Sequence, residues 1–519
     1  MKIMGAGWGT LTLAGLAGCS GGNDAATSGS SAAPTSGPAK GGKAVISYKD
    51  SADTMFLPAS STTLDRFYAS PALESLGRLD KDGNTEPWLA EALDVDKDAL
   101  TLTITLRDGV KFSDGSDCNA EAVAWNLQQY VDNGHASELD NPTSFETPDD
   151  KTVVVHYDTW NNDWDNVIGQ CRVCSKQSFD ENGQEWAATH PVGTGPFVID
   201  DFVAGTSISY KRNDDYRIEG QPYLDEIEFS IITDVNTQIA SMQNDEVNGL
   251  ITQDMTAIQT LEGSGFENVS ANGPEQNDIM YFLFNSLDTS KPCGDIRVRE
   301  AIMHCIDWEN VASSLTGGLG KACNQFALEG SWAYNPDVKF FEYDPEQGMQ
   351  LLSDAGFPDG FDIDIYTISN NEPIATALQS CLSEIGITGN IQVVDSSVLA
   401  SMQEADSIDG IVIGRGSSKM DFLNNYIRLY SKEGIKNHGI MLCPDDYEQA
   451  LANAKAAETT DEKKKWEQEA SKMLVETYIM LCPMASVPTG YFVSAGFTDH
   501  ELGQTIFEQW APEAAYFAA

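Results

Sequence analysis

Cationic side chains are scarce in this sequence. Lysine and arginine together number 31, against 79 aspartate and glutamate residues, and the formal net charge is −48. A protein that binds nucleic acid needs clustered cations to neutralise the phosphates, and the chain has no such cluster. This argues against a nucleic-acid partner and favours a strongly solvated surface as the meaning of the acidity. A preference for cationic ligands is the alternative interpretation.

Histidine is equally scarce, and the residue patterns of common catalytic sites are missing. None of the six histidines lies two or four residues from another, so the sequence shows no local pair of metal ligands. After residue 42 there is neither His-Glu-x-x-His nor a Gly-x-Ser-x-Gly elbow. The glycine-rich run 317–322 lacks the first glycine and the hydroxyl of a phosphate-binding loop. We therefore expect a binding protein and not an enzyme, with no catalytic residue, metal site or cofactor.

Long apolar runs are also absent. A helix needs about 20 apolar residues to span a bilayer, and no stretch after the N-terminal segment is that long. The segment before Cys19 holds about 15 apolar residues behind one charge, Lys2, which is the layout of a secretion signal. Its end, Leu16-Ala17-Gly18-Cys19, resembles a bacterial lipobox, in which the cysteine receives a lipid. We expect 1–19 to be a lipoprotein signal peptide with Cys19 as the lipid anchor, or an ordinary signal peptide with an incidental cysteine.

Large apolar side chains are almost absent from residues 20–42, which are rich in glycine, serine and alanine. Such a segment cannot bury enough surface to offset the entropy lost on ordering it. The sequence therefore predicts a disordered tether with an end-to-end distance on the order of 25–30 Å. A tether of this kind would hold a folded body away from a membrane.

The ten cysteines do not form an obvious framework. Setting Cys19 aside leaves nine, an odd number. Cys171 and Cys174 make a lone Cys-x-x-Cys, and a four-cysteine zinc site would need a second such pair. Export would permit disulfides, so a local disulfide and free thiols both remain open.

What the sequence does contain is an alternation of strand and helix patterns. Residues 100–106 alternate apolar residues with threonine, which predicts a half-buried strand, and Asn119 is placed to cap the following helix. Farther along, a strand over 361–365, a helix over 373–385 and a strand over 390–394 form a βαβ unit, which implies a parallel pair. With 519 residues and 41% hydrophobic content, the chain is expected to fold as α/β in two or three lobes.

Three shorter patterns mark chain turns and helix starts. Asp295 and Asp344 are each placed to cap a helix, and Pro345 suits the first helical position after Asp344. Gly193-Thr194-Gly195-Pro196 combines flexible and fixed φ angles, which predicts a sharp chain reversal between lobes.

Seven stretches, in this order, carry a family resemblance. The most characteristic is PWLAEALDVDKDALTLTITLRDGVKFSDGSDCNAEAV (87–123), and the second is HPVGTGPFVIDDFVAGTSISYKRNDDY (190–216). The others are QPYLDEIEF (221–229), DIRVREAIMHCID (295–307), YDPEQGMQLLSDAGFPDGF (343–361), ALQSCLSEIGI (377–387) and DEKKKWEQEASKMLVE (461–476). Together they resemble the family-5 extracellular solute-binding proteins of ABC importers, the peptide/nickel type. The resemblance covers nearly all of the chain after the tether.

The resemblance implies a type II periplasmic-binding-protein-like fold of the α/β class, with two main lobes joined by a hinge and an extra inserted lobe. Lobe I would comprise 43–60, 193–271 and 488–519. The inserted lobe II would comprise 61–192, and lobe III 272–487. The ligand would lie in the cleft between lobes I and III, outside strand ends, and the lobes would close on it by hinge motion.

The resemblance also implies a function. The chain would be a substrate-binding lipoprotein of an ABC importer that captures short peptides and delivers them to the permease subunits. It would act as a monomer in the cell envelope, lipid-anchored on the outer face of the cytoplasmic membrane, in a periplasmic or extracellular setting. The same fold could instead bind a saccharide, a modified amino acid or a metal chelate. A secreted hydrolase or a peptide chaperone is the alternative from a different class.

Family members that bind peptides often carry Trp-x-x-Asp late in lobe III, and this aspartate pairs with the peptide's ammonium group. The corresponding region, residues 408–426, lacks the tryptophan, and a serine at 417 or 418 falls near the expected aspartate. Asp421 is the candidate replacement, or it belongs to the following helix. Arg415, just after the apolar strand 411–413, could hold a ligand carboxylate through two hydrogen bonds. An ion pair within the protein is the alternative for Arg415.

Loops that follow apparent strands supply further candidates. Met55 ends the loop 49–55, and Tyr366 and Asn370 lie after the strand 361–365, where they could stack on a ligand backbone or hydrogen-bond to it. Trp332 is another aromatic candidate. Packing or turn roles are the alternative for each of these residues.

Overall fold

The computed structural model describes residues 38–519, except 61, 81–82, 271–277, 405–407, 418–421, 435–436, 438, 504–508 and 519. The predicted signal peptide with Cys19, most of the predicted tether, and Asp421 lie outside the described residues. Within them, no helix combines the length and the apolar character needed to cross a bilayer. The last predicted tether residues contact the folded body, since the Gly41 N–H donates to the Tyr223 carbonyl at 2.8 Å.

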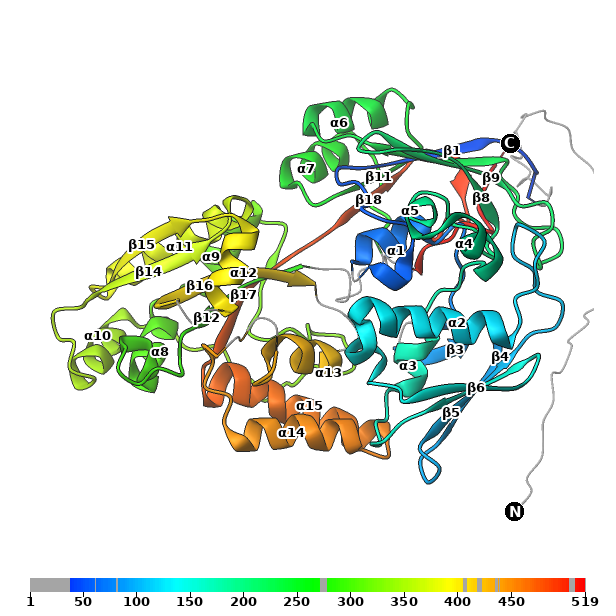
Figure 1. Ribbon diagram of the computed structural model, residues 1–519. Coiled ribbons are helices and arrows are strands. Elements are labelled where there is room, and N and C mark those ends of the chain that lie inside the picture. The colour runs from blue at the N-terminus through cyan, green and yellow to red at the C-terminus, as the bar shows by residue number, and fades with distance from the viewer. Residues whose placement is uncertain are drawn as a thin grey trace, which may run out of the picture. The chain divides into compact units, whose positions relative to one another are not determined.

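Lobe I is built on a six-stranded sheet whose strands come from the start, the middle and the end of the chain (Figure 1). β1 runs parallel to both β10 and β11. Helices α6 and α7 cover one face. On the other face α1, which falls within the bounds predicted for lobe II, packs Phe67 against Phe229, with ring centroids 5.2 Å apart. The strand order is β18 (Gly490–Val493), β11 (Gly249–Thr252), β1 (Lys43–Tyr48), β10 (Glu226–Ile231), β9 (Ser207–Arg212), β8 (Phe197–Val203); the helices are α1 (Thr63–Ala69), α6 (Val235–Gln243) and α7 (Met255–Gly263).

Lobe II is a four-stranded antiparallel sheet covered by helices. The predicted strand is confirmed as β5, in which Leu102, Ile104 and Leu106 are buried between half-buried threonines. Asn119 caps α2 as predicted, because its side chain accepts the Ala122 N–H at 3.0 Å. The strand order is β4 (Ala90–Asp96), β5 (Thr101–Leu106), β7 (Thr152–His156), β6 (Ser144–Asp149); other elements are β2 (Gly77–Leu79), β3 (Thr85–Pro87), α2 (Ala120–Tyr130), α3 (Trp164–Gly169), α4 (Lys176–Asn182) and α5 (Gln184–Ala187).

Lobe III has a six-stranded sheet with helices on both faces. Alternate residues of β12 separate two cores, since Phe282 and Phe284 pack under α8, α9 and α11, whereas Tyr281 and Leu283 pack under α14 and α15. The strand order is β13 (Lys321–Ala322), β17 (Leu481–Val487), β12 (Asp278–Phe284), β16 (Gly410–Ser417), β14 (Asp362–Thr367), β15 (Thr388–Val393). The helices are α8 (Ile296–His304), α9 (Trp308–Thr316), α10 (Pro345–Asp354), α11 (Glu372–Glu384), α12 (Ser396–Glu404), α13 (Phe422–Asn425), α14 (Asp445–Ala456) and α15 (Thr460–Lys472).

Local sequence signals in lobe III are confirmed. The side chain of Asp295 accepts the Arg297 N–H and begins α8, and that of Asp344 accepts the Gln347 N–H and begins α10 with Pro345 in its first turn. The predicted βαβ unit is β14, α11 and β15, with the two strands parallel. The fold class is α/β, as predicted.

The Gly193–Pro196 segment differs from its prediction in the physical reason for its glycines. Neither Gly193 nor Gly195 has a positive φ. Instead both press against the backbone of a loop after α1: a Cβ on Gly195 would lie 2.4 Å from the Pro71 carbonyl oxygen, and one on Gly193 would lie 2.1 Å from that of Ala72. The requirement for glycine is therefore close backbone approach and not conformational freedom.

The nine described cysteines are all buried free thiols. Burial raises the pKa of both Cys171 and Cys174 to about 12, so neither has the thiolate character of a reactive pair. The sequence left a local disulfide and free thiols open, and the described cysteines are free thiols.

Candidate functional site

Lobes I and III are joined at one end of the lobe I sheet. The chain passes between the two sheets once from α7 to β12 and once from β17 to β18 (Figure 1). Thr252, the last residue of β11, pairs with Gly490, the first residue of β18, so the second crossing lies at the carboxyl end of β11. Crevices outside the carboxyl ends of strands are the usual ligand sites of such sheets.

Three polar side chains form a closed ring of hydrogen bonds at this junction. Arg415, near the end of β16, donates from Nε to Oδ2 of Asp278 at 2.9 Å and from Nη2 to Oε1 of Gln253 at 3.1 Å. Gln253, directly after β11, donates from Nε2 to Oδ2 of Asp278 at 3.1 Å. Gln253 therefore connects lobe I to an ion pair of lobe III by hydrogen bonds. We call Gln253, Asp278 and Arg415 the junction cluster.

The strand register explains why Arg415 and Asp278 meet. β12 and β16 are antiparallel, and Met280 lies opposite Arg415, so Asp278 is a diagonal neighbour two residues away along the strand. The side chains are 27% and 22% exposed, respectively, which leaves the pair accessible to a ligand. Thr489, which lies in the second crossing, is also bonded to this cluster, since Gln253 donates to its Oγ1 at 3.3 Å.

Further charged groups surround the junction cluster. Burial raises the pKa of Tyr48, the last residue of β1, and the carboxylates of Asp50 and Asp278 raise it further against the opposing charge of Arg415. Asp50 and Lys49 follow β1 directly, with their charged groups 3.9 Å apart. The junction thus carries carboxylates and cations together. Chemically, such a site can pair with both ends of a ligand that bears an ammonium and a carboxylate group.

Of the residues predicted from the sequence, Arg415 lies in the junction cluster. The predicted alternative, an ion pair within the protein, is also present, because Arg415 pairs with Asp278. Among the described residues, none forms a hydrogen bond with Nη1 of the Arg415 guanidinium. The structure thus brings Arg415 to the inter-lobe junction and leaves its Nη1 without a hydrogen bond to the described residues.

The structure does not bring Met55, Tyr366, Asn370 or Trp332 to this cluster. Met55 is fully buried in the lobe I core, and its N–H donates to the Ala188 carbonyl at 2.7 Å. Tyr366 is only 8% exposed, and its hydroxyl donates to Asp364 at 3.3 Å. Asn370 is exposed in a single helical turn. Trp332 lies near Phe422 and the Lys463 ammonium, with the latter 5.9 Å from its ring.

Sequence reasoning missed Gln253, Asp278 and Thr489. A signal existed for Gln253, because it directly follows the four buried residues of β11. The loop after β1 was predicted as a candidate for the same reason, because it directly follows an apolar strand. Asp278 had no comparable signal, since it stands at the start of an apolar strand and not at its end.

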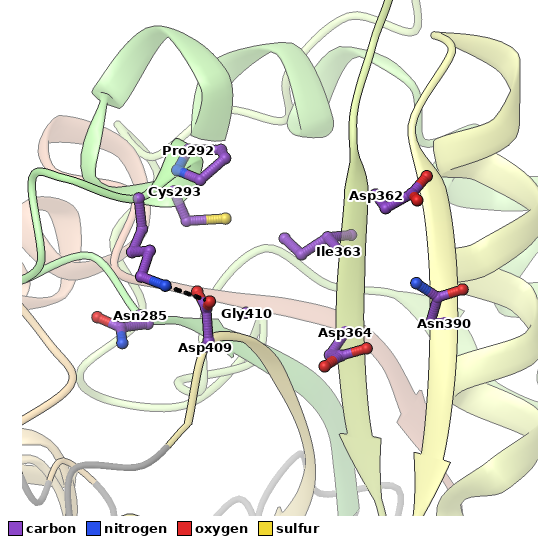
Figure 2. Close-up of a pocket in the computed structure, with 10 residues that line it drawn as sticks. Asn285, Pro292, Cys293, Asp362, Ile363, Asp364, Asn390, Asp409 and Gly410 are labelled. Carbon is purple, nitrogen blue, oxygen red and sulfur yellow. Dashed lines mark hydrogen bonds and ion pairs between the residues drawn. The ribbon is translucent and has the colours of Figure 1, made fainter.

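A second polar hollow lies at the opposite end of the lobe III sheet, where β14 and β16 begin (Figure 2). It has a volume of about 260 Å³ and is lined mainly by Asp362, Asp364, Asp409, Asn285 and Lys291. Lys291 pairs with Asp409, and Asp364 accepts hydrogen bonds from Tyr366 and Gln392. We assign no ligand to this hollow.

A family model and known relatives match a large part of this chain. The family model described as bacterial extracellular solute-binding proteins, family 5 Middle, matches residues 84–437. The glutathione-binding protein GsiB of Salmonella typhi is 29% identical over 356 residues, which are 66% of this chain and 68% of that protein.

Two solved structures share the fold over almost the whole chain. The ABC transporter-associated periplasmic binding protein DppA from Helicobacter pylori, in complex with the peptide STSA, has a TM-score of 0.77 at 20% identity and covers 93% of this chain and 99% of its own. NikA from Brucella suis, in complex with Fe(III)-EDTA, has a TM-score of 0.79 at 19% identity and covers 91% and 100%. The predicted type II periplasmic-binding-protein fold, with two main lobes and an inserted lobe, is thereby confirmed.

Proposed function

Because the chain belongs to the bacterial extracellular solute-binding proteins of family 5, we propose that it captures short peptides between lobes I and III and delivers them to the permease subunits of an ABC importer. The observation that supports this most is the junction cluster. It contains an arginine and an aspartate, both hydrogen-bonded from the opposite lobe by Gln253, where the two sheets meet. A peptide with free ends has the complementary pair of charges.

The proposal gives each charge a partner. Nη1 of Arg415 donates to the ligand carboxylate, while its other bonds keep the guanidinium fixed against Asp278 and Gln253. Asp50, two residues after β1, is 53% exposed at its side chain, and in this proposal it receives the ammonium group. Asp421 remains the alternative partner for that group, as the sequence predicted.

Names of the related proteins support a peptide but leave the solute open. GsiB is named for glutathione and DppA was solved with a peptide, whereas NikA was solved with Fe(III)-EDTA. A metal chelate is therefore the second candidate, alongside a saccharide or a modified amino acid. The described residues contain no group of three or more His, Cys, Asp or Glu side chains that could hold a bare ion, so a chelator would have to supply the metal's ligands.

We also propose that the peptide leaves unchanged and that the protein acts as a monomer anchored through Cys19 on the outer face of the cytoplasmic membrane. The mass of a peptide recovered after incubation tests the first point, because a hydrolase would return fragments. The mass of the mature N-terminus tests the anchor, because lipidation adds a diacylglycerol to the Cys19 thiol.

Peptides with free ends are expected to raise the melting temperature. A ligand that binds only the folded state at a hundred times its Kd stabilises it by about 2.7 kcal/mol. We would measure thermal unfolding with dipeptide and oligopeptide pools, and with the same peptides acetylated or amidated. Free peptides should shift the melting temperature, and blocking either end should reduce the shift. No shift with any peptide, beside a clear shift with a sugar or an iron chelate, would replace peptides as the ligand class.

A further inference from the structure

Lobe II contacts lobe III at the end of a helix. A loop of lobe II, residues 157–163, supplies four hydrogen bonds to carbonyl groups at the C-terminal end of α14. The Asn162 N–H donates to Lys455 at 3.1 Å, its side-chain amide to Ala454 at 2.9 Å and to Ala457 at 3.0 Å, and Nε1 of Trp160 to Ala456 at 3.2 Å. The last carbonyls of a helix have no donor within the helix. Lobe II therefore caps α14.

Ion pairs surround these hydrogen bonds. Lys455 of α14 pairs with Asp140, and Lys463 of α15 pairs with Asp163 at 2.7 Å. Lys97 of lobe II pairs with Glu458 in the opposite sense. Asp140 and Asp163 are only 10% and 8% exposed at their side chains, so both are screened by salt less than a surface pair would be.

The composition of the chain makes this concentration of lysines informative. The sequence has 31 cations against 79 carboxylates, yet three lysines meet carboxylates at this one contact. The pair of reversed sense opposes any sliding of α14 along lobe II, because a shifted helix would bring like charges together. We call the loop 157–163, Lys97 and Asp140, together with the end of α14 and the start of α15, the clasp.

The clasp lies away from the two crossings that join lobes I and III (Figure 1). Lobe II is fixed to lobe I separately, through the ion pairs Arg78–Glu513 at 2.8 Å and Arg217–Glu74 at 3.1 Å. A rotation of lobe III about the crossings would therefore carry α14 away from lobe II. In the present arrangement the clasp is made and Gln253 of lobe I also reaches Arg415 and Asp278 of lobe III.

We propose that, in the protein without ligand, the clasp stabilises the present arrangement of lobe III. The clasp and the ligand together then set the equilibrium between the closed and open forms. This gives lobe II a part in binding, although it supplies no residue of the junction cluster. The proposal rests on the proposed function only in taking the cleft to open and close around a solute. Apparent affinity then depends on the clasp, because it scales with the fraction of molecules in the competent form.

The double variant Asn162→Ala/Lys455→Ala tests the clasp without any ligand. It removes two of the four hydrogen bonds, both made by the Asn162 side chain, and one ion pair, and these side chains lie outside the hydrophobic cores. We expect small-angle X-ray scattering to give a larger radius of gyration for the ligand-free variant than for the wild type.

The matched control is Lys464→Ala. It also removes one lysine charge, here from α15, and the Lys464 side chain has no hydrogen-bond or ion-pair partner among the described residues. Its radius should equal that of the wild type. A radius of the double variant that is unchanged or smaller, with circular dichroism showing a folded protein, would overturn the proposal. With a peptide that stabilises the wild type, the Kd of the double variant should rise about tenfold. An unchanged Kd would overturn it as well, whereas absence of peptide binding to the wild type would contradict only the proposed function.

Discussion

Replacing Gly195 with alanine is expected to lower the free energy of unfolding by about 3 kcal/mol, the upper part of the range for overpacking. The new Cβ would stand 2.4 Å from the Pro71 carbonyl oxygen and 2.7 Å from the carbonyl carbon of Ala72. Both are backbone atoms, so no side-chain rotation relieves the clash. The loop that must retreat also holds the hydrogen bonds from Gly195 N–H to Ala72 and from Phe197 N–H to Pro71, at 2.9 and 3.0 Å.

The measurement is urea unfolding of Gly195→Ala beside Gly263→Ala. Gly263 is the last residue of α7, and a Cβ there would meet nothing within 4 Å. Alanine at that position should be neutral or stabilising by up to about 1 kcal/mol through helix propensity. If Gly195→Ala unfolded at the same urea concentration as the wild type, close backbone approach would not be the reason for this glycine.

Replacing Arg415 with alanine should weaken peptides with a free carboxylate by about 1–3 kcal/mol, the usual worth of a hydrogen bond to a charged group. That is roughly a fivefold to 150-fold rise in Kd. The loss has two sources, because the variant lacks the donor for the ligand and also leaves Asp278 without its cation. The uncompensated carboxylate would then repel the ligand carboxylate.

A comparison of ligands separates these effects from general damage. Titration calorimetry of the wild type and Arg415→Ala with one peptide, in its free and its C-terminally amidated form, completes a double cycle. The variant should lose affinity for the free peptide and little for the amide. Equal losses for both would indicate disturbed lobe packing, and unchanged affinity for both would remove Arg415 from the site.

Gln253 offers a matched control for the same cycle. Gln253→Ala removes the contact from lobe I and keeps the Arg415–Asp278 pair, so it should weaken free and amidated peptides alike. The reason is that Gln253 bonds to the ion pair across the lobes and is assigned no contact with the ligand. Preferential loss for the free peptide would instead place Gln253 on the ligand carboxylate.

Local patterns predicted the elements because they report what neighbouring residues do. The alternation in β5 and the capping side chains of Asn119, Asp295 and Asp344 each act within a few residues. The position of Arg415 at the inter-lobe junction could also be predicted, since it required only an apolar strand followed by a charged side chain. Tyr366 fits that pattern less well, because it lies inside β14 and its hydroxyl turns back toward Asp364.

By itself, the sequence determined the α/β class and the family, and it named Arg415 as a candidate for the cleft. Tertiary structure decided what that arginine contacts, because its partners are distant along the chain: Asp278 is 137 residues away and Gln253 is 162. It also decided that Gly195 serves close approach, and that Asn162 caps a helix 292 residues farther on. Such contacts depend on how separate lobes pack, and no pattern within a short window of sequence encodes that packing.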